Sequence, residues 1–247
     1  MPSFTQEQAR ELAYDKLRNS GCSDENLQGI TDGIIDAELS GIKSHGFHYL
    51  PIYCNHLKIG KIKGKAQAYI EKISSAAIKV NADNGFAHSA INLGFETLFE
   101  GCSQMGIASM SVYNSYNCGV LGFHTKRIAE KGFMGLGFTN APASIAPIGG
   151  IKAVVGTNPF SLAVPLNGQA EIIIDQSASV VAKSEISVRA KTGESIPEGW
   201  AFDSQVTGNK IDISCDCLGV AGGWTPAVHL FTQSGGKLKF DENNKVF

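Results

Sequence analysis

Hydrophobic residues recur at helical spacing in three stretches of the first half of the chain. The first stretch follows the capping box Thr5-Gln6-Glu7-Gln8 and ends before Gly21. The second has Ser23 as its N-cap candidate and ends before Gly41. The third covers residues 84–106 and stops at a glycine. The pattern therefore predicts three amphipathic helices.

Short apolar segments of strand length follow the third predicted helix. They cover residues 107–113, 133–139 and 171–175, and a glycine precedes each of the first two. Residues 125–131 fit a short helix between these two segments. Helices and strands thus alternate, a pattern typical of a mixed or parallel sheet covered by helices. We therefore predict an α/β fold.

The pattern of residues divides the chain into three parts. Residues 1–60 are mainly helical and end near a loop that contains two histidines. Residues 61–205 carry the other predicted elements, which include an extended segment over 158–165 and a helix over 179–191. Residues 206–247 show neither clean periodicity nor helix caps, so this divergent tail is left unassigned.

Composition and charge exclude several classes of protein. The 247 residues, 43% of them hydrophobic, are enough for one large domain or two small ones with a sizeable core. With 21 basic and 23 acidic residues, the chain lacks the excess positive charge of nucleic-acid and membrane-surface binders. Its apolar stretches fall short of the roughly 18 residues of a membrane span, and its polar N-terminus does not resemble a secretory signal. We therefore expect a cytoplasmic protein with reduced cysteines.

The cysteines and histidines give little support to a metal site. Of six cysteines, only Cys215 and Cys217 lie close together, and an isolated Cys-x-Cys is weak evidence for a metal. His45, His48 and His56 lie within one short segment, but no nearby Asp, Glu or Cys completes a coordination set. We predict no metal.

Common catalytic and nucleotide-binding motifs are absent from the sequence. The nearest approach to Gly-x-Gly-x-x-Gly is Gly135-Leu136-Gly137, and Gly60–Ala66 has the wrong spacing for a P-loop. Neither Gly-x-Ser-x-Gly nor His-Glu-x-x-His occurs. These absences argue against a doubly wound dinucleotide fold, a nucleoside triphosphatase and the simplest hydrolases.

Ser44 and His45 lie between a predicted helix and Pro51, where we expect a loop. An imidazole titrates near pH 6.5, so His45 can deliver a proton to a developing alkoxide or amine at neutral pH, with Ser44 orienting the ring. The alternative is a helix-terminal histidine that is bonded to a backbone carbonyl.

Polar residues also follow or end predicted strands, where α/β sheets place ligands. Asn117 lies in the segment after the strand over 107–113, and Asp175 ends the strand over 171–175. Thr139-Asn140-Ala141-Pro142 and Thr157-Asn158-Pro159 form a matching pair of Thr-Asn-Pro-type segments. Each of these segments can instead be a simple turn, and Asp175 can instead cap a helix.

Five motifs in the chain resemble, in order, those of one enzyme family. They are Ser44-His45-Gly46, Asp83-Asn84-Gly85-Phe86, Gly156-Thr157-Asn158-Pro159, Asp175-Gln176-Ser177 and Ile196-Pro197-Glu198-Gly199-Trp200. Between about residues 5 and 205 the chain resembles the malate/L-lactate dehydrogenase family, whose members lack a Rossmann fingerprint. The resemblance implies that family's own α/β architecture, a mixed sheet with covering helices, and a homodimer.

The resemblance also implies an oxidoreductase that moves a hydride between NAD or NADP and a small 2-oxo acid, 2-hydroxy acid or cyclic 2-imino acid. Within residues 1–60, His45 would donate the proton, with Ser44 beside it. Residues 61–205 would be the cofactor-binding core. The cofactor would be bordered by Glu171, Ile172, Ile173, Ile174, Asp175, Gln176 and Ser177, and the substrate would contact Tyr49, Asn117 and Thr157.

The chain departs from this family at three places. Tyr49 stands where many members have an arginine that grips the substrate carboxylate, and Asn117 stands where many have a second histidine. Members also continue for roughly a hundred more residues, and the tail after about residue 205 does not resemble theirs. We expect exposed apolar surface where that part would pack.

Two other hypotheses remain at this stage. The chain can be a non-catalytic, truncated remnant that keeps part of the fold and binds cofactor poorly. It can also be a hydrolase or lyase that uses His45 with a carboxylate, although the sequence offers no clear nucleophile or metal for that chemistry.

Overall fold

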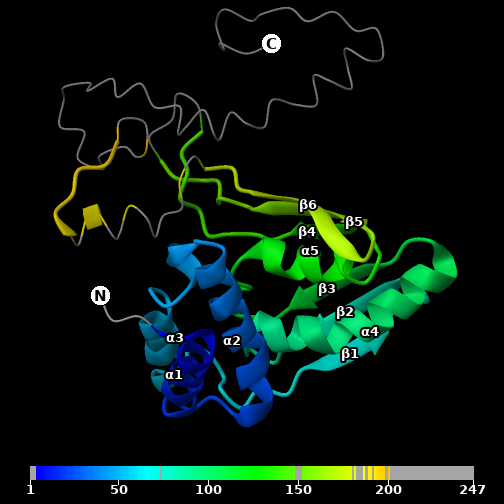
Figure 1. The fold of residues 1–247 in the computed structure, drawn as a ribbon, viewed down its shortest axis with the longest axis horizontal. Helices are drawn as coiled ribbons and strands as arrows, with labels where there is room; N and C mark the ends of the chain where they lie inside the picture. Colours follow the sequence, from blue (N-terminus) through cyan, green and yellow to red (C-terminus); the bar gives the residue numbers. More distant parts are fainter. Residues whose placement is uncertain are drawn as a thin grey trace, which may run out of the picture.

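The computed structural model describes residues 4–72, 74–147 and 152–179, together with 181, 186, 189–190, 192–197 and 200. Most of the helix predicted over 179–191 and all of the tail after residue 205 lie outside these residues. Within them, helices and strands form a helical layer and two three-stranded sheets (Figure 1).

The helical layer consists of α1 (Gln6–Arg18), α2 (Asp24–Leu39) and α3 (Leu50–Lys58). The predicted capping box begins α1: the amide of Gln8 donates to the Thr5 hydroxyl at 3.2 Å, and the amide of Thr5 donates to the Gln8 side chain at 3.0 Å. Ser23 is the N-cap residue of α2, as predicted. The apolar faces of the three helices meet in one core, whose most buried members include Leu17, Leu27, Ile30, Ile34 and Tyr53.

The first sheet contains β1 (Tyr69–Lys72), β2 (Ala77–Asn81) and β3 (Ser109–Tyr113) in that order. β1 pairs antiparallel with β2, and β2 pairs parallel with β3, so this sheet is mixed, as predicted. The parallel connection is made by α4 (Ala87–Met105), which packs on the sheet (Figure 1). A β-carbon at Gly94 would overlap the Met110 side chain, so glycine lets α4 approach the sheet closely.

The second sheet contains β4 (Gly135–Phe138), β5 (Phe160–Leu166) and β6 (Gln169–Gln176), all antiparallel. The helix α5 (Leu121–Ala129) packs against it (Figure 1). The helix and strand alternation did not predict a separate antiparallel sheet. Its signal is the Asn167-Gly168 pair between β5 and β6, since both residues have the positive φ of a tight hairpin turn.

Several predicted elements need correction. The short helix placed over 125–131 is α5, which starts four residues earlier, at Leu121. The region after His45 is not a loop that ends at Pro51: Lys43–His45 form a 3-10 turn and α3 starts at Leu50. The mistake has a simple cause, because proline is compatible with the first turn of a helix, where its missing amide hydrogen is not needed.

The apolar run of β6 is not that of a buried strand. Ile172, Ile173 and Ile174 are 41–50% exposed, and Leu136 and Phe138 on β4 are also exposed. The expectation that apolar surface is exposed where a further part would pack stays a prediction. None of the described helices combines the length and the apolar character that a membrane span needs.

Candidate active site

His45 is held at the junction of α2 and α3. The chain leaves α2 through Gly41, whose positive φ of 74° reverses its direction, and the amide of Ile42 donates to the carbonyl of Ala37 at 2.8 Å. Ser44 Oγ lies 2.9 Å from Nδ1 of the His45 ring. This contact orients the ring and leaves Nε2 as the nitrogen that can serve chemistry.

A carboxylate that the sequence did not single out fixes this junction. The amide of Phe47 donates to Oε1 of Glu38 at 2.6 Å. A β-carbon at Gly46 would overlap the same carboxylate. Glycine after His45 is therefore needed for the close contact between Glu38 and the turn.

Asp175, at the end of β6, is brought near His45 from the second sheet. Its Oδ2 accepts a 2.6 Å hydrogen bond from the amide of Gly122, in the first turn of α5. A β-carbon at Gly122 would lie 2.8 Å from that oxygen, so the close approach requires glycine. Strand β6 and helix α5 thus fix a carboxylate whose charge acts on His45.

His45 and Asp175 each shift the pKa of the other. Burial lowers the pKa of His45, and the negative charge of Asp175 opposes this by raising it. Burial raises the pKa of Asp175, and the Gly122 amide and His45 act in the opposite direction. Each group therefore favours the charged form of the other.

The segment after β3 is folded back onto the helical layer. Asn114 takes a left-handed φ of 48°, and the amide of Tyr116 donates to the carbonyl of Gly85 at 2.8 Å. Asn117 Oδ1 accepts from the Tyr53 hydroxyl at 3.0 Å and from the Gly119 amide at 3.3 Å. The amide oxygen of Asn117 is thus occupied, and its NH₂ group is the part that can meet a ligand.

Tyr49 stands directly beside His45. The two rings are stacked, with centroids 6.3 Å apart and planes 10° from parallel. Tyr53 packs edge-on against Tyr49 at 4.8 Å. A phenol therefore borders the imidazole on the side where the resemblance led us to expect an arginine.

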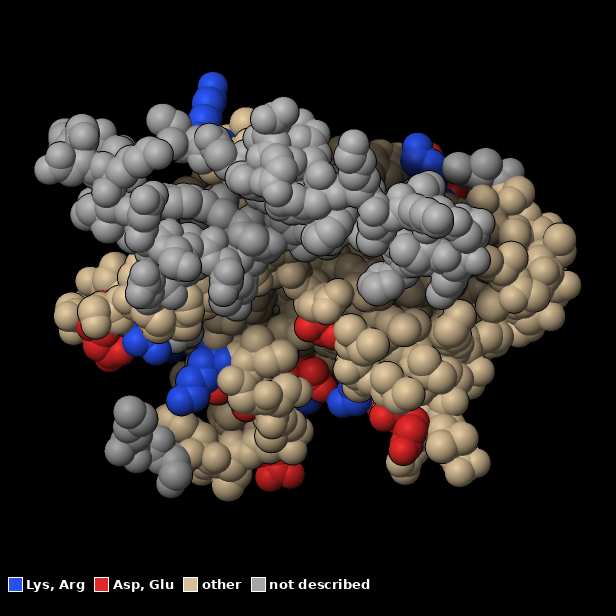
Figure 2. All heavy atoms as spheres, turned by 90° about the horizontal axis from the view of Figure 1, so that it is seen from above, with Lys and Arg blue, Asp and Glu red and all other residues tan. Residues whose placement is uncertain are grey.

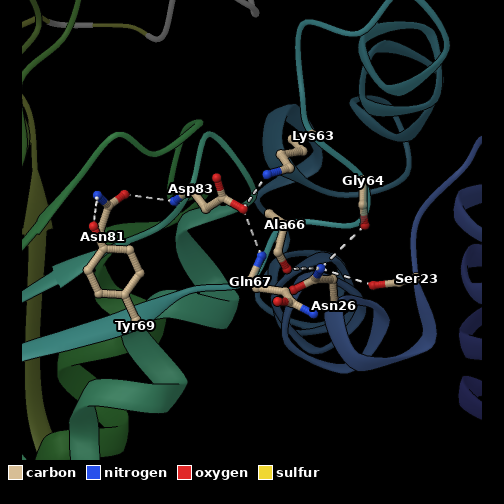
Figure 3. A network of polar contacts seen from close by, with 9 residues as sticks. All are labelled: Ser23, Asn26, Lys63, Gly64, Ala66, Gln67, Tyr69, Asn81 and Asp83. Atoms are coloured by element: carbon tan, nitrogen blue, oxygen red, sulfur yellow. Dashed lines mark hydrogen bonds and ion pairs between the residues drawn. The ribbon is translucent and has the colours of Figure 1, made fainter.

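The Asp83-Asn84-Gly85-Phe86 motif has a structural role, and Figure 3 shows the contacts of Asp83. Oδ2 of Asp83 accepts from Nζ of Lys63 at 2.5 Å and from the amide of Gln67 at 3.0 Å. The hydrogen bond and charge of Lys63, together with the Gln67 amide, lower the pKa of this carboxyl group. The Asn84 amide donates to the carbonyl of Asn114 at 2.7 Å, so the motif supports the segment that carries Asn117.

A second part of the network in Figure 3 ties the helical layer to the same region. Asn26, which is buried on α2, donates through Nδ2 to the carbonyl oxygens of Ala66 at 3.0 Å and Gly64 at 3.3 Å and to the Ser23 hydroxyl at 3.1 Å. A buried amide with these partners fixes the position of α2 relative to the segment that leads into β1.

The two Thr-Asn segments predicted from the sequence lie side by side. The amide of Ala141 donates to Oδ1 of Asn158 at 3.0 Å, and the amide of Thr139 donates to the carbonyl of Pro159 at 3.2 Å. The carbonyl of Thr157 accepts from the amide of Ala178 at 2.7 Å, so Thr157 lies next to the end of β6.

Two buried histidines that the sequence analysis did not single out support the Asn117 segment. His124 Nε2 lies 2.8 Å from the carbonyl of Cys118, and the His88 and His124 rings are 5.2 Å apart. Burial lowers the pKa of both, for His124 to about 4, so both are neutral at pH 7. A β-carbon at Gly119 would lie 3.0 Å from Nε2 of His88.

Comparison with known proteins places these residues in a family. Residues 4–210 match the family model of malate/L-lactate dehydrogenase. The chain belongs to the malate/L-lactate dehydrogenase family. This confirms the resemblance drawn from the five motifs.

Curated relatives within the malate/L-lactate dehydrogenase family carry different substrate names. The chain is 36% identical over 196 residues to the (2R)-3-sulfolactate dehydrogenase (NADP(+)) of Chromohalobacter salexigens, which covers 79% of this chain and 59% of the relative. It is 32% identical over 205 residues to the Delta(1)-pyrroline-2-carboxylate/Delta(1)-piperideine-2-carboxylate reductase of Pseudomonas aeruginosa, which covers 83% and 61%. The chain spans about three fifths of the length of these relatives.

Solved structures agree with this placement in the family. The delta1-piperideine-2-carboxylate reductase of Pseudomonas syringae superposes with a TM-score of 0.76 at 26% identity, over 81% of this chain and 60% of that one. The malate dehydrogenase of Entamoeba histolytica gives a TM-score of 0.75 at 25% identity, over 81% and 55%. The predicted fold, α/β and of the malate/L-lactate dehydrogenase type, is confirmed.

The structure gathers only part of the residue set expected from the family. His45 contacts both Ser44 and Tyr49, and the charge of Asp175 raises the pKa of His45. Ile172, Ile173 and Ile174 pair with β5 along the strand that leads to Asp175. Among the described residues, no group of three or more His, Cys, Asp or Glu side chains forms a metal-binding cluster.

Proposed function

We propose that the protein is an NAD(P)-dependent oxidoreductase that transfers a hydride between the nicotinamide and a small 2-oxo acid, 2-hydroxy acid or cyclic 2-imino acid. The contact of Ser44 with His45, in a chain that belongs to this family, is the observation that carries the proposal. Relatives named for sulfolactate, malate and Delta(1)-pyrroline-2-carboxylate support the substrate class.

His45 would be the proton donor to the carbonyl oxygen or imine nitrogen during reduction. Ser44 holds its Nδ1, so the proton would leave from Nε2. Asp175 favours the protonated imidazole against the effect of burial, which keeps a proton available nearer neutral pH. In the reverse direction, the same nitrogen would accept the proton of the hydroxyl or amine.

The residues of β6 have chemistry that fits a nicotinamide cofactor, which supplies the hydride when it is bound. Ile172, Ile173 and Ile174 offer half-exposed apolar side chains, which suit a flat heterocycle. Gln176 and Ser177 follow with an amide and a hydroxyl, which suit a carboxamide and ribose hydroxyls. With Glu171 and Asp175, they are the residues that would border NAD or NADP.

Substrate recognition would rest on neutral groups. Tyr49 supplies a phenol beside His45, Asn117 supplies an amide NH₂, and Thr157 supplies a hydroxyl next to the end of β6. Residues 1–60 would contribute the catalytic loop and residues 61–205 the cofactor-binding core.

We also propose a cytoplasmic homodimer that acts on small molecules and not on nucleic acid. The support is the family and the balanced charge, with a net value of −2. On the face seen in Figure 2, the basic side chains of the described residues lie among acidic ones.

A titration of the purified chain with NADH and with NADPH, followed by fluorescence, tests the proposal. Micromolar binding of either cofactor is the expected result. Malate, sulfolactate or Delta(1)-pyrroline-2-carboxylate is then added with the cofactor in the matching redox state, and cofactor oxidation or reduction is followed. Absence of binding up to millimolar concentration would favour the alternative, a non-catalytic remnant. The intact Ser44, His45 and Asp175 arrangement favours the enzyme.

A further inference from the structure

One face of α3 is directed at the segment that follows β3. Tyr49, Tyr53 and His56 are spaced by four and three residues, so they share a helix face that begins at the N-cap. Tyr53 donates to Asn117, and His56 contacts Tyr116. This face of α3 therefore contacts both Tyr116 and Asn117 in the segment after β3.

The contact between His56 and Tyr116 is a short hydrogen bond. Nδ1 of His56 lies 2.5 Å from the Tyr116 hydroxyl, and the two rings meet edge-on, with centroids 5.6 Å apart. Tyr116 is partly buried against the helical core, and Tyr53 and Phe86 pack edge-on against its ring. The phenol has little freedom to turn away from His56.

The protonation states fix the direction of this bond. Burial, together with the neighbouring Tyr49, raises the pKa of Tyr116, so this phenol keeps its proton. Burial and the positive charge of Lys61 lower the pKa of His56, which favours the neutral ring. Tyr116 therefore donates to Nδ1 of His56.

This chain of groups ends next to the catalytic imidazole. The Tyr53 ring packs edge-on against both Tyr116 and Tyr49, and the Tyr49 ring is stacked on His45. Packed between these rings, the Tyr49 phenol has little freedom to turn and keeps a constant position beside His45. His56, at the far end, is the residue that anchors the series.

We propose that His56 is a positioning residue for substrate recognition, which fixes the Tyr116 ring and, through the ring of Tyr53, the Tyr49 phenol beside His45. The inference rests on the proposed function, because it assigns Tyr49 to the substrate side of that site. It implies that the pocket orders a small 2-oxo acid through a preorganised array of neutral hydroxyl groups.

Steady-state kinetics with pyruvate or oxaloacetate, whichever is turned over, test the role. His56→Phe keeps an aromatic ring but loses the acceptor, and we expect it to raise KM about three- to tenfold, the effect of one neutral hydrogen bond. We expect kcat and the Kd for NADH or NADPH to change less than about twofold. His56→Gln, which restores an acceptor, should recover most of the loss.

Two further variants separate positioning from general damage. Tyr116→Phe should raise KM as His56→Phe does, and the double variant should be no worse than either single one. His48→Phe is the matched control, since His48 is an exposed histidine of the same region, and its KM should stay at the wild-type value. Turnover with an unchanged KM in His56→Phe would overturn the inference.

A spectroscopic measurement keeps this test distinct from that of the proposed function. In protein labelled with ¹⁵N-histidine, Nδ1 of His56 should show the signature of a hydrogen-bonded acceptor, lost in Tyr116→Phe. Oxamate, an unreactive analogue of a 2-oxo acid, should shift this signal in the presence of NADH or NADPH. If the His56 signal responds to oxamate but no turnover is seen, the inference is supported although the proposed reaction fails. If the His56 signal changes neither in Tyr116→Phe nor with oxamate, the inference is overturned.

Discussion

Asp175 at the end of β6 and His45 at the end of the 3-10 turn Lys43–His45 each stabilise the charged form of the other. The carboxylate is fixed by the amide of Gly122, so it cannot easily move away when the imidazole changes its charge. Two segments that lie far apart in the chain thereby set the proton affinity of one ring.

Asp175→Asn should therefore lower the pKa of His45, because the substitution removes the charge that opposes the effect of burial. The alkaline limb of kcat/KM for reduction should move to lower pH, and the rate at pH 7 should fall about tenfold, since less of the imidazole carries the proton. The pH profile of wild type and variant measures this shift. Two superimposable profiles would mean that Asp175 does not act on His45.

Gly122→Ala should also disturb the interaction between Asp175 and His45, because it displaces the Asp175 carboxylate. The added β-carbon would lie 2.8 Å from Oδ2 of Asp175, which must move and weaken its bond to the residue-122 amide. We expect a pH profile shifted as in Asp175→Asn, with a smaller loss of rate. Gly168→Ala is a control for glycine loss, because its β-carbon meets no atom within 4 Å, although its positive φ costs some stability.

Tyr49→Arg should lower the KM for an acid substrate by about five- to thirtyfold. A guanidinium gives a charged, two-pronged donor to a carboxylate in place of one neutral hydroxyl. The measurement is the KM of wild type and variant for the same 2-oxo acid at fixed cofactor concentration. An unchanged or higher KM would show that another group holds the carboxylate or that Tyr49 suits a different substrate.

The amphipathic period was enough to predict α1, α2 and α4, because each buries one continuous apolar stripe. The helix α3 escaped prediction because Pro51, in its first turn, was taken for a helix breaker. Since α3 was missed, the shared face of Tyr49, Tyr53 and His56 could not be seen either. The Asn167-Gly168 turn was a readable signal for the β5–β6 hairpin.

For the site, sequence reasoning found His45 and Asp175 separately but not their proximity. That relationship depends on how α5 and β6 pack next to the α2–α3 junction, which no local pattern encodes. Glu38, Gly122 and the two buried histidines were missed for the same reason, because their partners lie in other elements or across a turn.

The stability of the fold should decrease as the pH falls from about 6.5 to about 4. His124 binds a proton in the unfolded chain near its ordinary pKa, but in the folded chain only near a pKa of about 4. The unfolded state therefore takes up more protons across this window, and the shift corresponds to a loss of about 3 kcal/mol at its acid end. His88, whose pKa is also lowered by burial, acts in the same direction.

Urea unfolding of wild type and His124→Asn at pH 7 and pH 5 measures this effect. The variant is expected to be less stable at pH 7, since the bond to the Cys118 carbonyl is weakened, but to lose less on acidification. The comparison also removes the opposite contribution of Asp175, whose raised pKa is common to both proteins. Equal losses in the two proteins would rule out His124 as a source of acid sensitivity.

If His45 delivers the proton in a nicotinamide-dependent reduction, its replacement should slow turnover without weakening cofactor binding. His45→Gln and wild type are each given NADH or NADPH with a 2-oxo acid or cyclic imine, and cofactor binding and cofactor oxidation are followed in the same samples. We predict that cofactor affinity stays within about twofold while turnover falls by roughly 10² to 10⁴, the range for losing a general acid. Equal turnover in the two proteins would contradict the account.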